Sequence, residues 1–196
     1  MNEPLRKLPD TMTAEEFKAW PGDGAGGKYE LVDGELRMMS PASTTHGTMQ
    51  ANLSRLIGNH LLGGRCRVLS EPAVEIRVRA DVNRRVPDLG VTCTPDQRGE
   101  VELPDPILLV EIMSPGNKAD TWSNVWAYTT IPTVREILIV SSKRIFAQLL
   151  RRGPDESWPK EAAEIAADGA LALETIALTL PLKDAYAGTY LMQLGA

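Results

Sequence analysis

The stretch from Val86 to Pro115 reads VPDLGV, then a polar loop, and then PILLVEIMSP. Asp88 follows a proline at the start of a short apolar strand, and Glu111 ends an apolar run that begins at Pro106. An ionised carboxylate in such a run is costly to desolvate unless a cation lies beside it. Two acids at neighbouring strand ends therefore predict a divalent-metal site, the alternative being two ordinary solvated residues.

The chain after this loop carries the pattern of a central strand and a crossover. Ile107–Met113 is apolar on both faces, which predicts a buried central strand. We expect a helix from Lys118 to about Thr130 and a second apolar strand from Glu136 to Val140, a spacing that suits a crossover between parallel strands. An extended arm is expected over Arg144–Arg152, and a last short strand over Ala177–Leu182.

The chain before this stretch carries clear start and turn signals. Thr13-Ala-Glu-Glu16 is a capping box that predicts a short helix to about Trp20. Asp33-Gly34 lies between two alternating runs and predicts a β-hairpin over Tyr29–Met39. A helix is expected from about Thr44 to Leu62, ended by two glycines. Three further strands are expected over residues 66–70, 73–79 and 85–91, with a hairpin loop at 81–83.

Length and composition bound the class of protein. The 196 residues fit a single domain, expected over residues 1–196 with a loose leader at 1–12. The hydrophobic content of 43% is enough for a real core. The net charge of −5 excludes a generic nucleic-acid binder, so binding of this kind would need a local basic patch.

Several features bear on the compartment. No window approaches 18 consecutive apolar residues, and the N-terminal sequence MNEPLRKLPDTMTAEE has no apolar segment of a secretory signal. Cys66 and Cys93 lack the spacing of a metal site and are expected to be reduced, half-buried thiols. Together these features predict a cytoplasmic protein without a membrane partner.

Each of several other polar and aromatic residues has a structural and a functional interpretation. Glu30 in the hairpin and His46 in the first turn of the helix from Thr44 are either solvent-facing residues or polar groups at a site for an anionic substrate. Trp122 and Trp126, at helical spacing, are expected in the core rather than as base-stacking platforms. A cluster of arginines either contacts phosphates or forms a solvated face paired with Glu71, Glu75 and Asp81; its members are Arg65, Arg67, Arg77, Arg79, Arg84 and Arg85.

The sequence lacks the motifs that mark other kinds of catalytic site. The sequence has no glycine-rich phosphate loop between a strand and a helix, and no GxSxG nucleophile elbow. With only His46 and His60, a zinc site would have few nitrogen ligands.

An ordered set of short motifs resembles the Uma-two family of proposed restriction endonucleases, a branch of the PD-(D/E)XK nuclease superfamily. The matching segments are YELVDGEL (29–36), MSPASTTHG (39–47), GNHL (58–61), CRVLSEP (66–72), VPDLGV (86–91), LLVEIMSP (108–115), YTTIPTVREILIV (128–140) and TLPLKDAY (179–186). The resemblance implies an α/β (α+β) restriction-endonuclease-like fold, with a mixed central β-sheet flanked by helices.

The resemblance also assigns site positions. Asp88 matches the acid of the PD motif, Glu111 matches the acid of the (D/E)XK motif, and Met113 stands where that motif has lysine. In this family the lysine instead lies on the next helix, in the pattern D-x-x-x-K-x-x-x-Y, and Asn124 occupies its position here. An amide supplies no positive charge and is not a base near neutral pH. Lys118 is six residues away and points to another helix face.

The expected function is a Mg²⁺- or Mn²⁺-dependent endonuclease that hydrolyses phosphodiester bonds of DNA. Asp88, Glu111 and the Ile112 carbonyl would bind the metal, Glu30 and His46 would support the site, and Asn124 would orient water or phosphate. The alternatives are an impaired relative that binds nucleic acid or a protein partner through the same cleft, and a structural module without a ligand. A sheet edge or the arm at 144–152 could support a homodimer.

Overall fold

The computed structural model describes residues 8–114, 116 and 118–193. The helices are α1 (Ala14–Ala19), α2 (Thr44–Leu61) and α3 (Lys118–Tyr128). The strands are β1 (Tyr29–Val32), β2 (Glu35–Met38), β3 (Arg67–Ser70), β4 (Val74–Glu75), β5 (Arg84–Arg85), β6 (Leu89–Thr92), β7 (Pro106–Met113), β8 (Glu136–Ser141), β9 (Ala147–Arg151), β10 (Ala163–Ile165), β11 (Ala170–Leu173) and β12 (Leu178–Pro181). Most of the predicted leader lies outside the described residues, and it stays a prediction.

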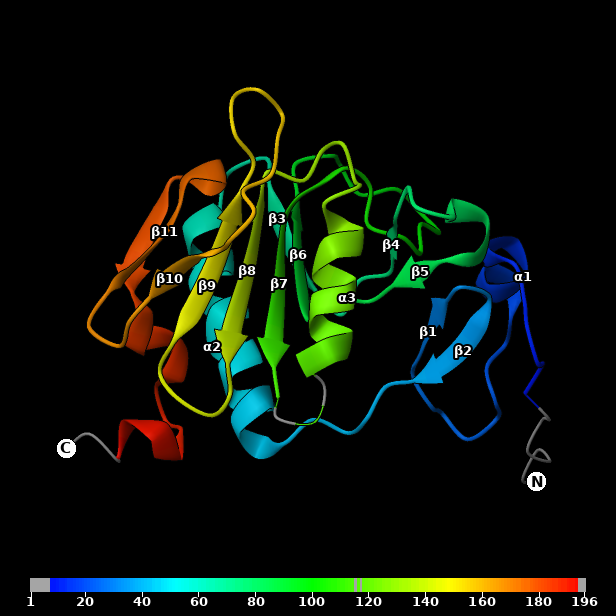
Figure 1. The fold of residues 1–196 in the computed structure, drawn as a ribbon, viewed down its shortest axis with the longest axis horizontal. Coiled ribbons are helices and arrows are strands. Elements are labelled where there is room, and N and C mark those ends of the chain that lie inside the picture. Colours follow the sequence, from blue (N-terminus) through cyan, green and yellow to red (C-terminus); the bar gives the residue numbers. More distant parts are fainter. Residues whose placement is uncertain (1–7, 115, 117, 194–196) are drawn as a thin grey trace.

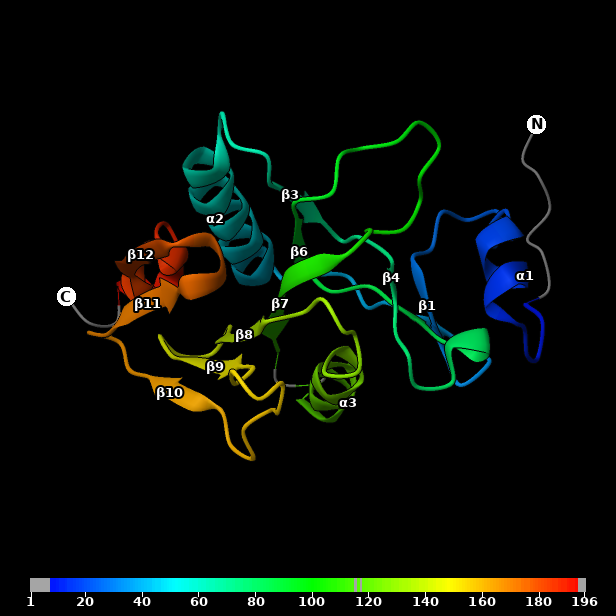
Figure 2. The ribbon, with the colours of Figure 1, turned by 90° about the horizontal axis from the view of Figure 1, so that it is seen from above.

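A six-stranded mixed sheet forms the centre of the molecule, in the order β10-β9-β8-β7-β6-β3 (Figure 1). β7 and β8 pair in parallel, while the other neighbours pair antiparallel. α2 covers one face of this sheet and α3 the other (Figure 2). The predicted class, a mixed central sheet flanked by helices, is confirmed.

β7 is the central strand because, apart from Glu111, its residues are apolar on both faces. Val110 and Ile112 pack in the same core cluster as Leu53 of α2. Leu109, on the opposite face, packs in the cluster that contains Tyr128 of α3. Side chains alternate along a strand, so Glu111 faces the α3 side of the sheet, as Leu109 does.

α3 is the predicted crossover helix between the parallel strands β7 and β8. Its buried residues include Val125 and Tyr128, which lie against the sheet. The expectation that both tryptophans belong to the core is wrong for Trp126, whose surface is 46% exposed. Trp122 is half-buried against the same core.

A smaller sheet beside α3 has the order β2-β1-β5-β4 (Figure 1). The predicted hairpin forms its first two strands, and the turn at Asp33 and Gly34 has φ values of 53° and 89°. The predicted capping box is also present, with Thr13 and Glu16 bonded to each other's backbone N–H groups before α1.

The strands predicted over residues 73–79 and 85–91 are confirmed only in part. The first shortens to Val74–Glu75, and the chain then bends at Arg77 and turns at Arg79 (φ 48°) into a 3-10 helix. The second divides into β5, which joins the smaller sheet, and β6, which joins the central sheet. Pro87 lies in the break, where it has no N–H to donate to a ladder. This break places Asp88 between the two sheets.

The predicted arm at Arg144–Arg152 is also corrected. Its central part is β9, which pairs with β8 on one side and β10 on the other. The strand is held there because Ala147, Leu149 and Leu150 are buried. Both edges of β9 are therefore occupied, so the arm gives no support to a homodimer, which stays a prediction.

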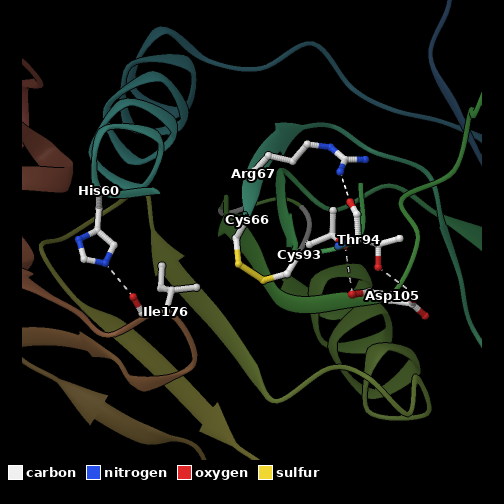
Figure 3. Close-up of a disulfide and its surroundings, with 8 residues drawn as sticks. His60, Cys66, Arg67, Cys93, Thr94, Asp105 and Ile176 are labelled. Atoms are coloured by element: carbon white, nitrogen blue, oxygen red, sulfur yellow. Dashed lines mark hydrogen bonds between the residues drawn. A yellow bond between two sulfur atoms is a disulfide. The ribbon is translucent and has the colours of Figure 1, made fainter. Parts of the chain in front are cut away.

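Cys66 and Cys93 form a disulfide, which contradicts the expected reduced thiols (Figure 3). Arg67 of β3 pairs with Thr92 of β6, so the register brings the flanking cysteines opposite each other. This pairing could not be read from a separation of 27 residues. The described residues include no free cysteine and no helix long and apolar enough to span a membrane. The cytoplasmic location stays a prediction.

We expect Cys66→Ala/Cys93→Ala to lower the free energy of unfolding by about 3 kcal/mol, because the disulfide restricts the unfolded chain. Urea unfolding without reductant measures this loss. Wild-type protein treated with dithiothreitol is the matched control and should lose a similar amount. Equal stability of the oxidised wild type and the variant would contradict the crosslink.

Candidate active site

Asp88 lies in the break between β5 and β6, with both carboxylate oxygens engaged. His46 Nε2 donates to Oδ1 at 2.8 Å, and the Ile112 backbone N–H donates to Oδ2 at 2.6 Å. Asp88 is therefore fixed between the start of α2 and the end of β7. Burial opposes a charge on His46, but the hydrogen bond and the charge of Asp88 raise the pKa of His46 overall.

The first two turns of α2 position the side chains that contact Asp88. Ser43 is the N-cap residue, and its hydroxyl accepts the N–H of His46 at 3.2 Å. Gln50 lies four residues after His46, on the same helix face, and its amide donates to the Asp88 carbonyl at 3.0 Å. The side chains of His46 and Gln50 thus hold the Asp88 side chain and backbone respectively.

Glu111 is buried, with 7% of its surface exposed, and it points toward α3. The Tyr128 hydroxyl donates to its Oε1 at 2.7 Å. Burial, and then the charge of Asp88, raise the pKa of Glu111 well above its ordinary value. Tyr128 was outside the predicted site, although the helix pattern that ends in tyrosine could have indicated it.

Asn124 joins two of the predicted acids. Its Nδ2 donates to Glu30 Oε1 at 3.3 Å, and its amide also favours the ionised form of Glu111. Glu30 Oε1 also accepts the Val86 N–H at 2.8 Å. Burial raises the pKa of Glu30 despite these donors. The structure therefore brings Glu30, Asn124 and Glu111 together, on the side of α3 that faces the hairpin.

Arg85 is a buried cation beside this acidic group. It is 4% exposed, its Nη1 donates to the Leu31 carbonyl at 3.3 Å, and its charge favours ionised Glu30. Its Nε is buried without a hydrogen-bond partner among the described residues. No pattern in the sequence indicates this position, because Arg85 reads as one member of a surface cluster.

The predicted arginine cluster does not form a single basic face. Arg84 is buried and donates to Glu102 at 2.5 Å, while Arg67 pairs with Asp96. The partners predicted for the cluster, Glu71, Glu75 and Asp81, are not the ones found in these pairs. Glu71 instead pairs with Lys28.

The groups that could hold a divalent ion are Asp88, Glu111 and the Ile112 carbonyl. The carbonyls of Ile107 and Met113 accept N–H groups of the chain at the two ends of β8, so they point toward β8. The N–H and carbonyl of successive residues in a strand point to opposite sides, so the Ile112 carbonyl points away from β8. The Ile112 N–H points the same way and donates to Asp88. Over residues 8–114, 116 and 118–193, no three His, Cys, Asp or Glu side chains form a metal-binding group. Two carboxylates, a carbonyl and retained waters nevertheless suit Mg²⁺.

Lys118 is not joined to this group by any ion pair or hydrogen bond within the described residues. It lies at the start of α3 and lines a separate pocket with Met113 and Trp122. The expectation that Lys118 points away from Asn124 is consistent with this placement.

Glu111 makes stability depend on pH. Its pKa is raised on folding, so the folded state keeps a proton that the unfolded chain releases above about pH 4.5, and stability falls as pH rises. We expect Glu111→Gln to remove a slope of up to about 1.36 kcal/mol per pH unit. Urea unfolding between pH 5 and 8 in EDTA tests this, with Glu161→Gln as an exposed-acid control. Parallel curves for wild type and Glu111→Gln would refute it.

Three comparisons relate the chain to known proteins. The Uma2 family model, described as "Putative restriction endonuclease", matches residues 14–182. An uncharacterized protein of Synechocystis sp. PCC 6803, slr1290, is 29% identical over 179 residues, which cover 90% of this chain and 92% of that protein. A crystal structure described as a putative nuclease belonging to DUF820, from Anabaena variabilis, aligns with a TM-score of 0.73 and 18% identity. That alignment covers 90% of this chain and 98% of the other, and it establishes similarity of fold.

Proposed function

The chain belongs to the Uma2 family, and from this premise we propose that it is a divalent-metal-dependent endonuclease acting on DNA. The observation that carries the proposal is the buried carboxyl of Glu111 beside Asp88 and Glu30, acids that come from three separate segments. Burial and mutual repulsion make such a group costly to ionise, and a bound cation would offset that cost.

Asp88, Glu111 and the Ile112 carbonyl would hold Mg²⁺ or Mn²⁺. When bound, the ion supplies charge stabilisation for a phosphate and lowers the pKa of a water. Tyr128 donates to Oε1 of Glu111 and so fixes the direction of this carboxyl. His46 and the Ile112 N–H fix the direction of the Asp88 carboxylate.

Glu30 and Asn124 would act on the water and the phosphate. Glu30 is a half-buried carboxyl with a raised pKa, which makes it a stronger base near neutral pH. The Asn124 amide, at 3.3 Å from Glu30, can orient a water or donate to a phosphate oxygen, but it adds no positive charge.

A second candidate function is binding without cleavage, of nucleic acid or of a protein partner. The observation that favours it is the neutral amide of Asn124 between Glu30 and Glu111, at the position where the family pattern has lysine. Without that charge, the site could bind a metal and a substrate yet stabilise the transition state poorly.

The two candidates are separated by an assay on supercoiled plasmid and circular single-stranded DNA. The wild-type protein with Mg²⁺ or Mn²⁺ should nick or linearise DNA, and EDTA should stop the reaction. Binding of DNA without any metal-dependent cleavage would support the second candidate and overturn the first.

A further inference from the structure

The pocket lined by Met113, Lys118 and Trp122 lies at the carboxyl ends of the parallel strands β7 and β8. Its volume is about 280 Å³, and its lining combines aromatic, basic and polar side chains. Ser141 and Gln148 lie on its sheet side, while Lys118 and Trp122 come from the first turns of α3. The candidate active site does not use these residues.

The pocket lies on the same face of the sheet as Glu111. Met113 lines the pocket, and it follows Glu111 by two residues on the same face of β7. In the strand register, Glu111 lies opposite Ile139, and Ile139 lies opposite Gln148. Two strand spacings place Gln148 about 10 Å from Glu111 across the sheet. β7, β8 and β9 lie side by side in Figure 1, with α3 in front of β7.

Two aromatic rings line this pocket. Phe146 is half-buried, and the Arg144 guanidinium lies over its ring at 4.1 Å. Trp122 is half-buried on the α3 side, with the exposed Trp126 ring 5.9 Å away. Such rings are the stacking platforms that proteins offer to unpaired bases.

The charges around the pocket favour an anion. Lys118 and Arg144 are both exposed at its rim, and neither forms an ion pair with another described residue. Glu164 is the acid in the lining, so the basic groups outnumber it. A ligand that combines a flat ring with a phosphate would satisfy the aromatic and the basic groups together.

We propose that this pocket takes one unstacked nucleotide of single-stranded DNA. The substrate strand would pass from the Glu111 site around the end of β7, with its phosphate near Lys118 and Arg144 and its base against Phe146 or Trp122. The proposal rests on the proposed function, because the path of the DNA strand is traced from the Glu111 site. It implies a preference for unpaired over duplex DNA.

The test measures anisotropy of fluorescein-labelled dT10 with the full chain in EDTA, where no cleavage occurs. Lys118→Glu/Arg144→Glu should weaken binding by about 30-fold, since two phosphate contacts are lost. Lys143→Glu/Lys160→Glu changes the net charge equally at exposed lysines outside the pocket, and it should change affinity less than about threefold. Phe146→Leu should weaken binding about tenfold through lost stacking, while duplex binding should not change.

Equal losses in the two charge-reversal pairs, or unchanged dT10 affinity in Phe146→Leu, would overturn the proposal. Inorganic phosphate competing as well as thymidine monophosphate would also overturn it, because the pocket would then be an anion site only. Cleavage by the wild type with normal binding by the pocket variants would reject the pocket alone. Pocket-dependent binding without cleavage would reject the proposed nuclease activity alone.

Discussion

Changing either proposed metal ligand to its amide, Asp88→Asn or Glu111→Gln, is expected to lower metal-dependent DNA cleavage by about 10³-fold or more. A metal ion is worth several kcal/mol of charge stabilisation, and each 1.36 kcal/mol is about tenfold in rate. In the Glu111→Gln variant, the new amide carbonyl can still accept the Tyr128 hydroxyl, so the fold should persist. The measurement is the initial rate of supercoiled plasmid nicking in Mn²⁺.

The control for these variants is Glu161→Gln, which removes an exposed acid and should cleave at the wild-type rate. Circular dichroism establishes that each variant is folded before rates are compared. Wild-type rates in both amide variants, with EDTA still stopping the reaction, would mean that other residues hold the metal.

Asn124→Lys is expected to raise the cleavage rate by about 10²-fold, which is the effect of one well-placed transition-state donor. Asn124 faces Glu30 and Glu111, so a lysine there would bring a positive charge into a group of acids. The same charge would lower the pKa of Glu111 and favour the form that binds a cation. Plasmid nicking at matched protein concentration gives the comparison.

Asn124→Gln is the matched control, because it lengthens the side chain without adding charge. It should leave the rate at or below that of the wild type. If the wild type is inactive and Asn124→Lys cleaves, the protein is a binding protein that lost one catalytic group. If neither cleaves, the missing charge is not what limits the site.

The central elements of the fold could be predicted because their signals are local. The run Ile107–Met113 is apolar on both faces, and the hairpin around Asp33-Gly34 has a two-residue turn signal. The division of residues 85–91 between two sheets depends on tertiary pairing, because Arg85 pairs with Val74 of β4 while Leu89 pairs with Ser70 of β3. Pro87 marks the break but does not indicate which sheet each half joins. The pairing of Cys66 with Cys93 likewise depends on the register of β3 and β6.

A motif names Asp88 and Glu111 as candidate metal ligands, and this role stays a prediction. The structure brings His46 to Asp88 and Glu30 to Asn124, contacts between residues that are far apart in the sequence. The burial of Arg85 beside Glu30 is a tertiary property, so no spacing in the sequence indicates it.

The most direct test of the account is calorimetric titration of Mn²⁺ into the wild-type protein and into Glu111→Gln at pH 8. The wild type should bind the ion and release protons, because the carboxyl of Glu111 must ionise to receive it. Glu111→Gln should show no binding at this site. Equal Mn²⁺ affinity in the two proteins would contradict the claim that Glu111 is a metal ligand.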